Sequence, residues 1–204
     1  MVADRRGGRR QGGVDVERRD AASGFEKRDL SVSMGAASVY VIVTTAPVTV
    51  LLAVAYSMLW GFGRLMDGFS GVGFLLYMVV VVAGIVAHEA IHGLSWVLFG
   101  RKPLGAIRFG FHVKSLSPYA HLKEPVRARV YRLGGAMPGV ALGLLPSLIG
   151  IVTGNGPIML FGLFFTFVAG GDALILWLIR RVDPNALVED HPTRAGCYVL
   201  EGPE

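Results

Sequence analysis

Residues 79–100, VVVVAGIVAHEAIHGLSWVLFG, are the stretch that decides how this chain folds. Nineteen of these 22 residues suit a hydrocarbon environment, and the other three are His88, Glu89 and His92. The stretch is long enough for a membrane-spanning helix, yet it holds two imidazoles and a carboxylate within five residues. Ionisable groups inside a span are costly unless they are paired, so this trio is a candidate functional site.

The apolar residues, 52% of the 204, gather in four blocks rather than being spread as a soluble core requires. Each block has at least 20 residues and, at about 1.5 Å per residue, can cross a hydrocarbon layer of roughly 30 Å as a helix. The first block begins after more than thirty residues, so we do not expect a cleaved signal peptide. The sequence predicts an all-α integral membrane protein with four transmembrane helices, at about residues 36–59, 72–99, 133–152 and 157–179.

Lys and Arg are unevenly divided between the connections of these blocks. Eight precede the first block, eight lie in residues 100–132 and three follow Ile179, whereas Arg64 is the single one in the other two connections. This asymmetry follows the positive-inside rule and predicts a multi-pass cell-membrane protein with both termini and the central loop in the cytoplasm. The cations suit a bilayer with an anionic inner leaflet, so the net charge of +5 requires no nucleic-acid partner.

The remaining segments predict a tail, a hairpin and a closing strand. Residues 1–33 are rich in Gly and Arg, which indicates a disordered basic cytoplasmic tail before a membrane-embedded domain at 34–204. Apolar and polar or small residues alternate over 107–113, and turn residues and "YAHL" follow, which predicts a short cytoplasmic β-hairpin between the second and third spans. "EDHPTRAGCYVL" favours a turn and a short strand over a metal pair of Asp190 and His191.

His88 and His92 are four residues apart and therefore share one face of a helix, where both can bind one metal ion. Glu89 is close enough to take a proton from a water molecule that the metal activates. This is the H-E-x-x-H pattern of zinc metallohydrolases, and it predicts one Zn²⁺ ion with Glu89 as the catalytic base.

A catalytic zinc usually has three protein ligands, and the third is open between Asp172, His112 and His121. Asp172 lies eight residues before Arg180, about 12 Å into its span, and His92 lies nine residues before Arg101, about 14 Å into its own. Asp172 is therefore level with the histidine pair and is the favoured ligand. His121 and His112 lie in the loop, so the loop would have to fold toward the histidine pair for either to bind the same ion.

"AHEAIHG" in one span and "GGDAL" in a later one resemble the site-2-protease class of intramembrane zinc metalloproteases. More narrowly, with "YAHLKEP" and "DHPTRAG", the chain resembles small multispanning bacterial and archaeal proteins grouped as "putative zincin peptidases". The resemblance implies His88, His92 and Asp172 as zinc ligands, Glu89 as general base, and peptide-bond cleavage near the cytoplasmic face of the membrane. The Asn and Pro that site-2 proteases commonly carry near their Asp-Gly are missing, so the group that stabilises the oxyanion is unassigned.

Two questions about function stay open. An extended substrate segment of a membrane protein or peptide could join the hairpin edge, with Phe109 and Phe111 positioning it; alternatively, the hairpin only anchors the protein at the interface. A metal-binding or transport protein without hydrolytic activity is the competing function. Glu89 favours the protease, because a non-catalytic site needs no carboxylate beside its first histidine. Substrate identity, regulation and oligomeric state are not indicated by these motifs.

Overall fold

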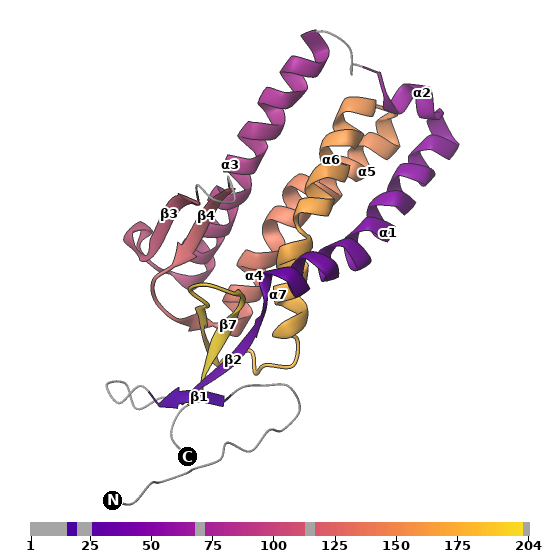
Figure 1. Ribbon diagram of the computed structural model, residues 1–204. Coiled ribbons are helices and arrows are strands. Elements are labelled where there is room, and N and C mark those ends of the chain that lie inside the picture. The colour runs from indigo at the N-terminus through magenta and orange to yellow at the C-terminus, as the bar shows by residue number, and fades with distance from the viewer. Residues whose placement is uncertain (1–15, 20–25, 68–71, 113–116, 202–204) are drawn as a thin grey trace, which may run out of the picture.

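The computed structural model describes residues 16–19, 26–67, 72–112 and 117–201. Four helical segments in this part of the chain are long and apolar enough to cross a membrane, at residues 34–60, 73–100, 128–153 and 156–178 (Figure 1). They are built from α1 (Met34–Trp60), α3 (Val72–Gly100), α4 (Ala128–Pro138), the π-helical stretch η2 (Gly139–Leu144), α5 (Leu145–Thr153), α6 (Gly156–Val168) and α7 (Gly170–Leu178), and the short helix α2 (Phe62–Leu65) follows α1.

The prediction of four long apolar helices is confirmed, and the third differs most at its start. It begins at residue 128 rather than 133, so Arg129 and Arg132 lie within the helix. The Arg132 guanidinium donates to the backbone carbonyls of Ile179 and Val182, which follow α7. These hydrogen bonds satisfy backbone acceptors that follow α7. They also give the charged Arg132 side chain partners, so this basic segment can be part of α4.

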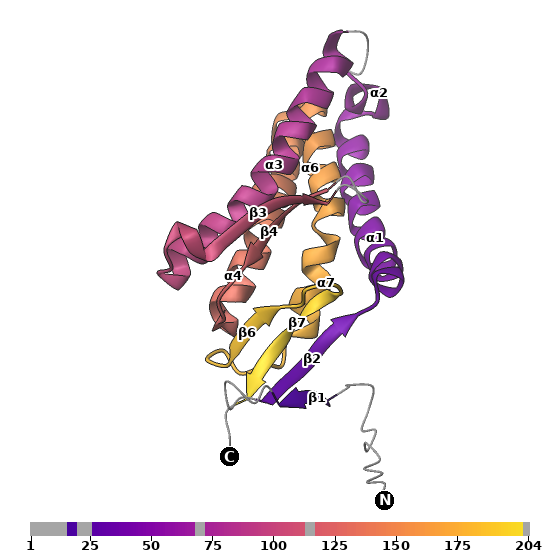
Figure 2. The ribbon, with the colours of Figure 1, turned by 60° about the vertical axis from the view of Figure 1, so that its left-hand side comes forward.

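The prediction of an all-α protein is wrong, because the helices stand on a five-stranded antiparallel sheet (Figure 2). Its order is β1 (Val16–Arg19), β2 (Glu26–Val32), β7 (Ala195–Glu201), β6 (Leu187–Asp190) and β5 (Val126–Arg127). β2 lies within the tail that was expected to be disordered, so that expectation is wrong for residues 26–32 and for β1; residues 1–15 and 20–25 lie outside the described part. The expected strand after "DHPTRAG" is β7.

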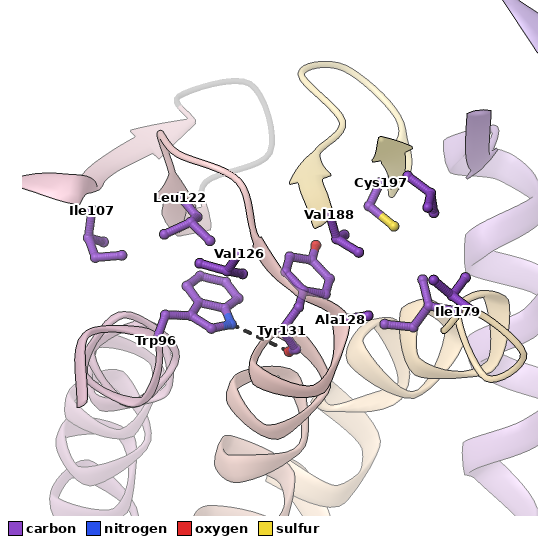
Figure 3. Close-up of a cluster of buried hydrophobic side chains, with 11 residues drawn as sticks. Trp96, Ile107, Leu122, Val126, Ala128, Tyr131, Ile179, Val188 and Cys197 are labelled. Carbon is purple, nitrogen blue, oxygen red and sulfur yellow. Dashed lines mark hydrogen bonds between the residues drawn. The ribbon is translucent and has the colours of Figure 1, made fainter. Parts of the chain in front are cut away.

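A buried cluster joins the sheet to the C-terminal ends of α3 and α7 and to the start of α4. Trp96 of α3 and Tyr131 of α4 stack with ring centroids 5.6 Å apart, below Val188 and Cys197 of the sheet (Figure 3). Ile179, after α7, is fully buried in the same cluster. Cys197 is also fully buried, and this burial raises the pKa of its thiol to about 12.

The expected hairpin is present as β3 (Ile107–His112) and β4 (Ser117–Leu122), after a 3₁₀ turn η1 (Leu104–Ala106). The two strands form a separate antiparallel sheet beside α3 (Figure 2). Ile107 and Leu122 face each other in its register and are buried in the cluster described above. The hairpin is therefore fixed to the helices by its apolar face.

The sheet can be tested through Gly196, whose φ of +141° and close approach to β2 both require glycine. A Cβ at this position would lie 2.3 Å from the Leu30 carbonyl oxygen. We expect Gly196→Ala to weaken the β2–β7 pairing and to speed maleimide labelling of Cys197 roughly tenfold or more, because a strained backbone conformation costs about 1–3 kcal/mol. Gly105→Ala is the control, since its Cβ would meet nothing within 4 Å. Equal labelling rates in both variants and wild type would contradict the described pairing.

Candidate metal centre

α3 carries His88 and His92 one turn apart on a buried face. The two imidazole rings meet edge to face with centroids 4.9 Å apart, and the residues are only 5% and 6% exposed. Phe165 of α6 stacks near His88, and Trp96 stacks on His92. These aromatic contacts restrict the rotation of both imidazoles, so their Nε2 atoms are held toward α7.

Asp172 in the first turn of α7 faces both histidines. Its Oδ2 lies 3.1 Å from His88 Nε2, and its Oδ1 lies 3.2 Å from His92 Nε2. The N-terminal end of a helix favours a negative charge, so the start of α7 suits a carboxylate at this position. Figure 1 shows α7 continuing from α6 beside α4, and a break at Ala169 separates the two helices.

The backbone of α4 orients His92. The carbonyl oxygen of Gly134 lies 2.9 Å from His92 Nδ1. Because a carbonyl can only accept, Nδ1 must be the protonated nitrogen, which leaves the lone pair on Nε2. Gly134 also packs tightly against α3, since a Cβ there would lie 2.1 Å from Trp96 Nε1. A larger residue would push the carbonyl away from His92.

The three side chains fit a zinc ion. One ligand atom from each of His88, His92 and Asp172 lies within 4.8 Å of the others. Two atoms bound to a tetrahedral zinc at about 2.0–2.1 Å are separated by roughly 3.3 Å, close to the two spacings from Asp172. His92 Nε2 and Asp172 Oδ1 are both acceptors, so they repel unless a proton or a metal cation lies between them. Two nitrogens and one carboxylate are a ligand set that zinc accepts.

Glu89 contacts the hairpin rather than joining the three candidate ligands. Its Oε2 accepts a hydrogen bond of 2.8 Å from the backbone N–H of Ala120 in β4. Glu89, His92 and Asp172 line a common cleft of about 500 Å³. The other lining residues come from α3, the hairpin, α4 and α7, and from β6, β7 and their connection: Trp96, Arg108, Tyr119, Ala120, His121, Tyr131, Gly135, Ile175, Leu176, Asp190, His191, Pro192, Arg194, Ala195 and Gly196.

Asp190 bonds side chains and backbone of several elements, a role that the sequence did not reveal. Its carboxylate accepts hydrogen bonds from the Leu122 backbone N–H at 2.9 Å and from the Tyr131 hydroxyl. It also pairs with His121 Nδ1 at 3.4 Å, and this interaction raises the pKa of His121. Asp190 thus connects β4, α4 and β6. The sequence placed it in a turn before a short strand, but its partners, 59 and 68 residues away, were not visible there.

The remaining candidates from the sequence lie elsewhere. His121 lines the cleft but pairs with Asp190 and is not among the three clustered ligands. His191 accepts backbone hydrogen bonds at Nδ1 from Thr193 and Arg194, so it stabilises the β6–β7 turn. His112 ends β3, and its side chain lies outside the described part.

Phe109 and Phe111 do not line the cleft. Each is 55% exposed, and the Phe109 ring lies over Gly93 of α3, where a Cβ would be 2.6 Å from its Cζ. Their substrate-positioning role therefore stays a prediction. The residues of the hairpin that do line the cleft include Tyr119, Ala120 and His121 of β4.

Comparison with known proteins agrees with this arrangement of residues. No curated protein and no solved structure matches the chain. A family model described as "Putative zincin peptidase" matches residues 81–187, which are 107 of the 204 residues and include the His88–His92 motif and Asp172. Zincins are zinc-dependent peptidases, so this match agrees with the metal geometry above. The chain belongs to the "putative zincin peptidase" family.

Proposed function

We propose that the protein is a membrane-embedded zinc metallopeptidase that hydrolyses peptide bonds of membrane or membrane-proximal proteins near the cytoplasmic face. The observation that carries this proposal is the cluster of His88, His92 and Asp172, with ligand atoms within 4.8 Å, inside helices apolar enough to span a membrane. Glu89 beside this cluster is what hydrolysis requires and a metal store does not. The chain's membership of the zincin family supports the same chemistry.

His88, His92 and Asp172 would hold one zinc ion. When bound, zinc supplies a Lewis acid that polarises the scissile carbonyl and makes a water molecule more acidic. Glu89 takes a proton from the attacking water and later returns it to the leaving amine. The hydrogen bond from Ala120 holds the Glu89 carboxylate at the wall of the cleft, where substrate and water meet.

The substrate would lie along β4, whose outer edge faces the cleft. In the β3–β4 ladder, backbone groups point alternately toward the partner strand and away from it. The N–H groups of Ala120 and Leu122 point away from β3, since they donate to Glu89 and Asp190. Phe109 and Phe111 oppose Ala120 and Pro118, so their N–H groups point to the opposite edge of the hairpin. Because these two N–H groups are already bonded, an extended peptide would use the outward carbonyl groups of β4 and would lie at the metal site, whereas one that adds beside Phe109 and Phe111 would not.

The charge pattern supports a cytoplasmic opening of the cleft. Its walls include β4 and the β6–β7 turn, which belong to segments rich in Lys and Arg, while the connection that holds Arg64 is at the other end of the helices. By the positive-inside rule both termini and the hairpin are cytoplasmic. Water and an unfolded stretch of substrate can then enter from that side without crossing hydrocarbon.

The ligand assignment predicts which variants lose zinc. His88→Ala and Asp172→Ala should each remove most of the bound zinc from purified protein, because two ligands remain where three are needed. His121→Ala should retain about one equivalent, since His121 pairs with Asp190 instead. Elemental analysis by mass spectrometry measures this. Full zinc content in Asp172→Ala, or loss of zinc in His121→Ala, would contradict Asp172 as the third ligand and favour a residue of the loop.

Catalysis depends on Glu89 separately from metal binding. Glu89→Gln should keep about one zinc and still accept the Ala120 N–H, but it should lower peptide cleavage at least 100-fold, within the range for general acid–base groups. Cleavage is measured on a proteome-derived peptide library by mass spectrometry. Undiminished cleavage by Glu89→Gln would exclude this mechanism. A wild-type protein that binds zinc and cleaves no peptide would favour the metal-binding alternative.

Proline substitutions test which edge of the hairpin takes part in cleavage. Ala120→Pro removes the N–H that holds Glu89 at the β4 edge, and Phe111→Pro removes one that points to the opposite edge, so neither breaks a β3–β4 hydrogen bond. We expect Ala120→Pro to lower cleavage at least tenfold with zinc retained, and Phe111→Pro to have a smaller effect. The reverse order would place the substrate beside Phe109 and Phe111. Equal loss of zinc and cleavage in Ala120→Pro would indicate a structural role only.

A further inference from the structure

A second cavity, of about 800 Å³, lies between the end of α3 and the start of α4. It shares no lining residue with the metal cleft. Its walls come from residues 99–102, 125–127, 129, 130 and 133, and from Leu187 of β6. α3 and α4 touch beside it, since a Cβ at Gly100 would lie 3.3 Å from Val130 Cγ1. The proposed peptidase chemistry uses none of these residues.

The cavity is lined by four cations, Arg101, Lys102, Arg127 and Arg129. Lys102 pairs with Glu124 at 2.7 Å. Among the residues that the structure describes, no carboxylate lies within 4.0 Å of the other three guanidinium groups. Three arginines at one cavity with no acidic partner form a site for an anion, and guanidinium groups match phosphate oxygens in pairs.

The same cavity also has an apolar wall. Phe99 and Leu133 are 50% and 39% exposed, and Val130 lies between the two helices beside them. Phe99 and Gly100 end one candidate span, and Arg127 stands directly before another. The cations therefore lie at the level where the apolar helices end, and Phe99 and Leu133 belong to the candidate spans themselves. This is the order of groups in a phospholipid, with phosphate at the boundary and acyl chains beyond it.

We propose that this cavity binds one anionic phospholipid of the cytoplasmic leaflet, with its phosphate among Arg101, Arg127 and Arg129 and an acyl chain along Phe99 and Leu133. Basic pockets between spanning helices on the cytoplasmic side are suited to anionic headgroups. A free phosphate ion would use the cations and leave the apolar wall uncovered, so the lipid is the ligand that uses both. A bound lipid would join the end of α3 to the start of α4.

The experiment compares lipids on the purified full-length protein in a neutral detergent. Phosphatidylglycerol and phosphatidylcholine are titrated, and bound lipid is counted by native mass spectrometry while thermal unfolding is followed in parallel. We expect wild type to hold one phosphatidylglycerol in preference to phosphatidylcholine and to unfold at a higher temperature with it. Arg127→Gln and Arg129→Gln should each weaken this binding roughly fivefold or more, as expected for one cation near an anionic headgroup.

Arg181→Gln is the matched control, because Arg181 is exposed after α7, carries the same charge and does not line the cavity. An equal loss of phosphatidylglycerol in Arg181→Gln would show that only the overall surface charge attracts the lipid and would overturn the site. Protection by inorganic phosphate equal to that by phosphatidylglycerol would overturn the lipid assignment. Zinc content and lipid-free unfolding temperature confirm that each variant folds. If Arg127→Gln does not fold, the test uses Arg129→Gln alone. Zinc content and Glu89-dependent cleavage should be unchanged in the folded variants, so this proposal can fail independently of the peptidase.

Discussion

The rest of the structure depends on one constraint: ionisable groups inside an apolar helix bundle must be partners of one another. His88 and His92 on α3 and Asp172 on α7 are buried or half-buried where solvation by water is limited. Separating them would leave charges or polar nitrogens unpaired in apolar surroundings, at a cost of several kcal/mol. α3 and α7 are therefore held together at this level, and α4 must approach closely enough for the Gly134 carbonyl to bond His92. Glycine at 134 makes that approach sterically possible.

The sheet covers the buried cluster and supplies walls of the cleft that the helices alone cannot form. The end of α3, the start of α4 and the end of α7 meet in one buried cluster, and the strands cover it with Val188, Cys197 and Val199. Asp190 then binds the hairpin through Leu122 and α4 through Tyr131, so β4 is held beside Glu89 from two sides. The cleft consequently has one wall of helix and two walls of strand edges. A bundle with only a disordered tail and a loose loop would have exposed the same metal ligands without a surface for an extended peptide.

The features that the sequence predicted are those with a local signal. Long apolar blocks identify helices, alternation at 107–113 identifies a strand, and the His88–His92 spacing brings two ligands together within one helix. Asp172 was favoured because depth along a span can be counted in residues. β2 was missed because EKRDLSV carries two acids and two bases without alternation, and its pairing with β7 joins residues about 170 positions apart. The partners of Asp190 are likewise long-range, so no window of sequence contains them.

The α3–α4 pair links the metal centre to the nearby end of α3 and the start of α4. At His92 the two helices are joined by the bond to Gly134, and at Gly100, eight residues and about 12 Å further along α3, they meet again beside Val130. Both contacts occur where a glycine lets the backbones approach, so the relative position of the helices is set at two points. A ligand that binds between the helix ends acts on the second point, and the packing of Trp96 against Gly134 lies between that point and the zinc ligands. Trp96, which stacks on His92, therefore packs between the helix ends and the metal centre.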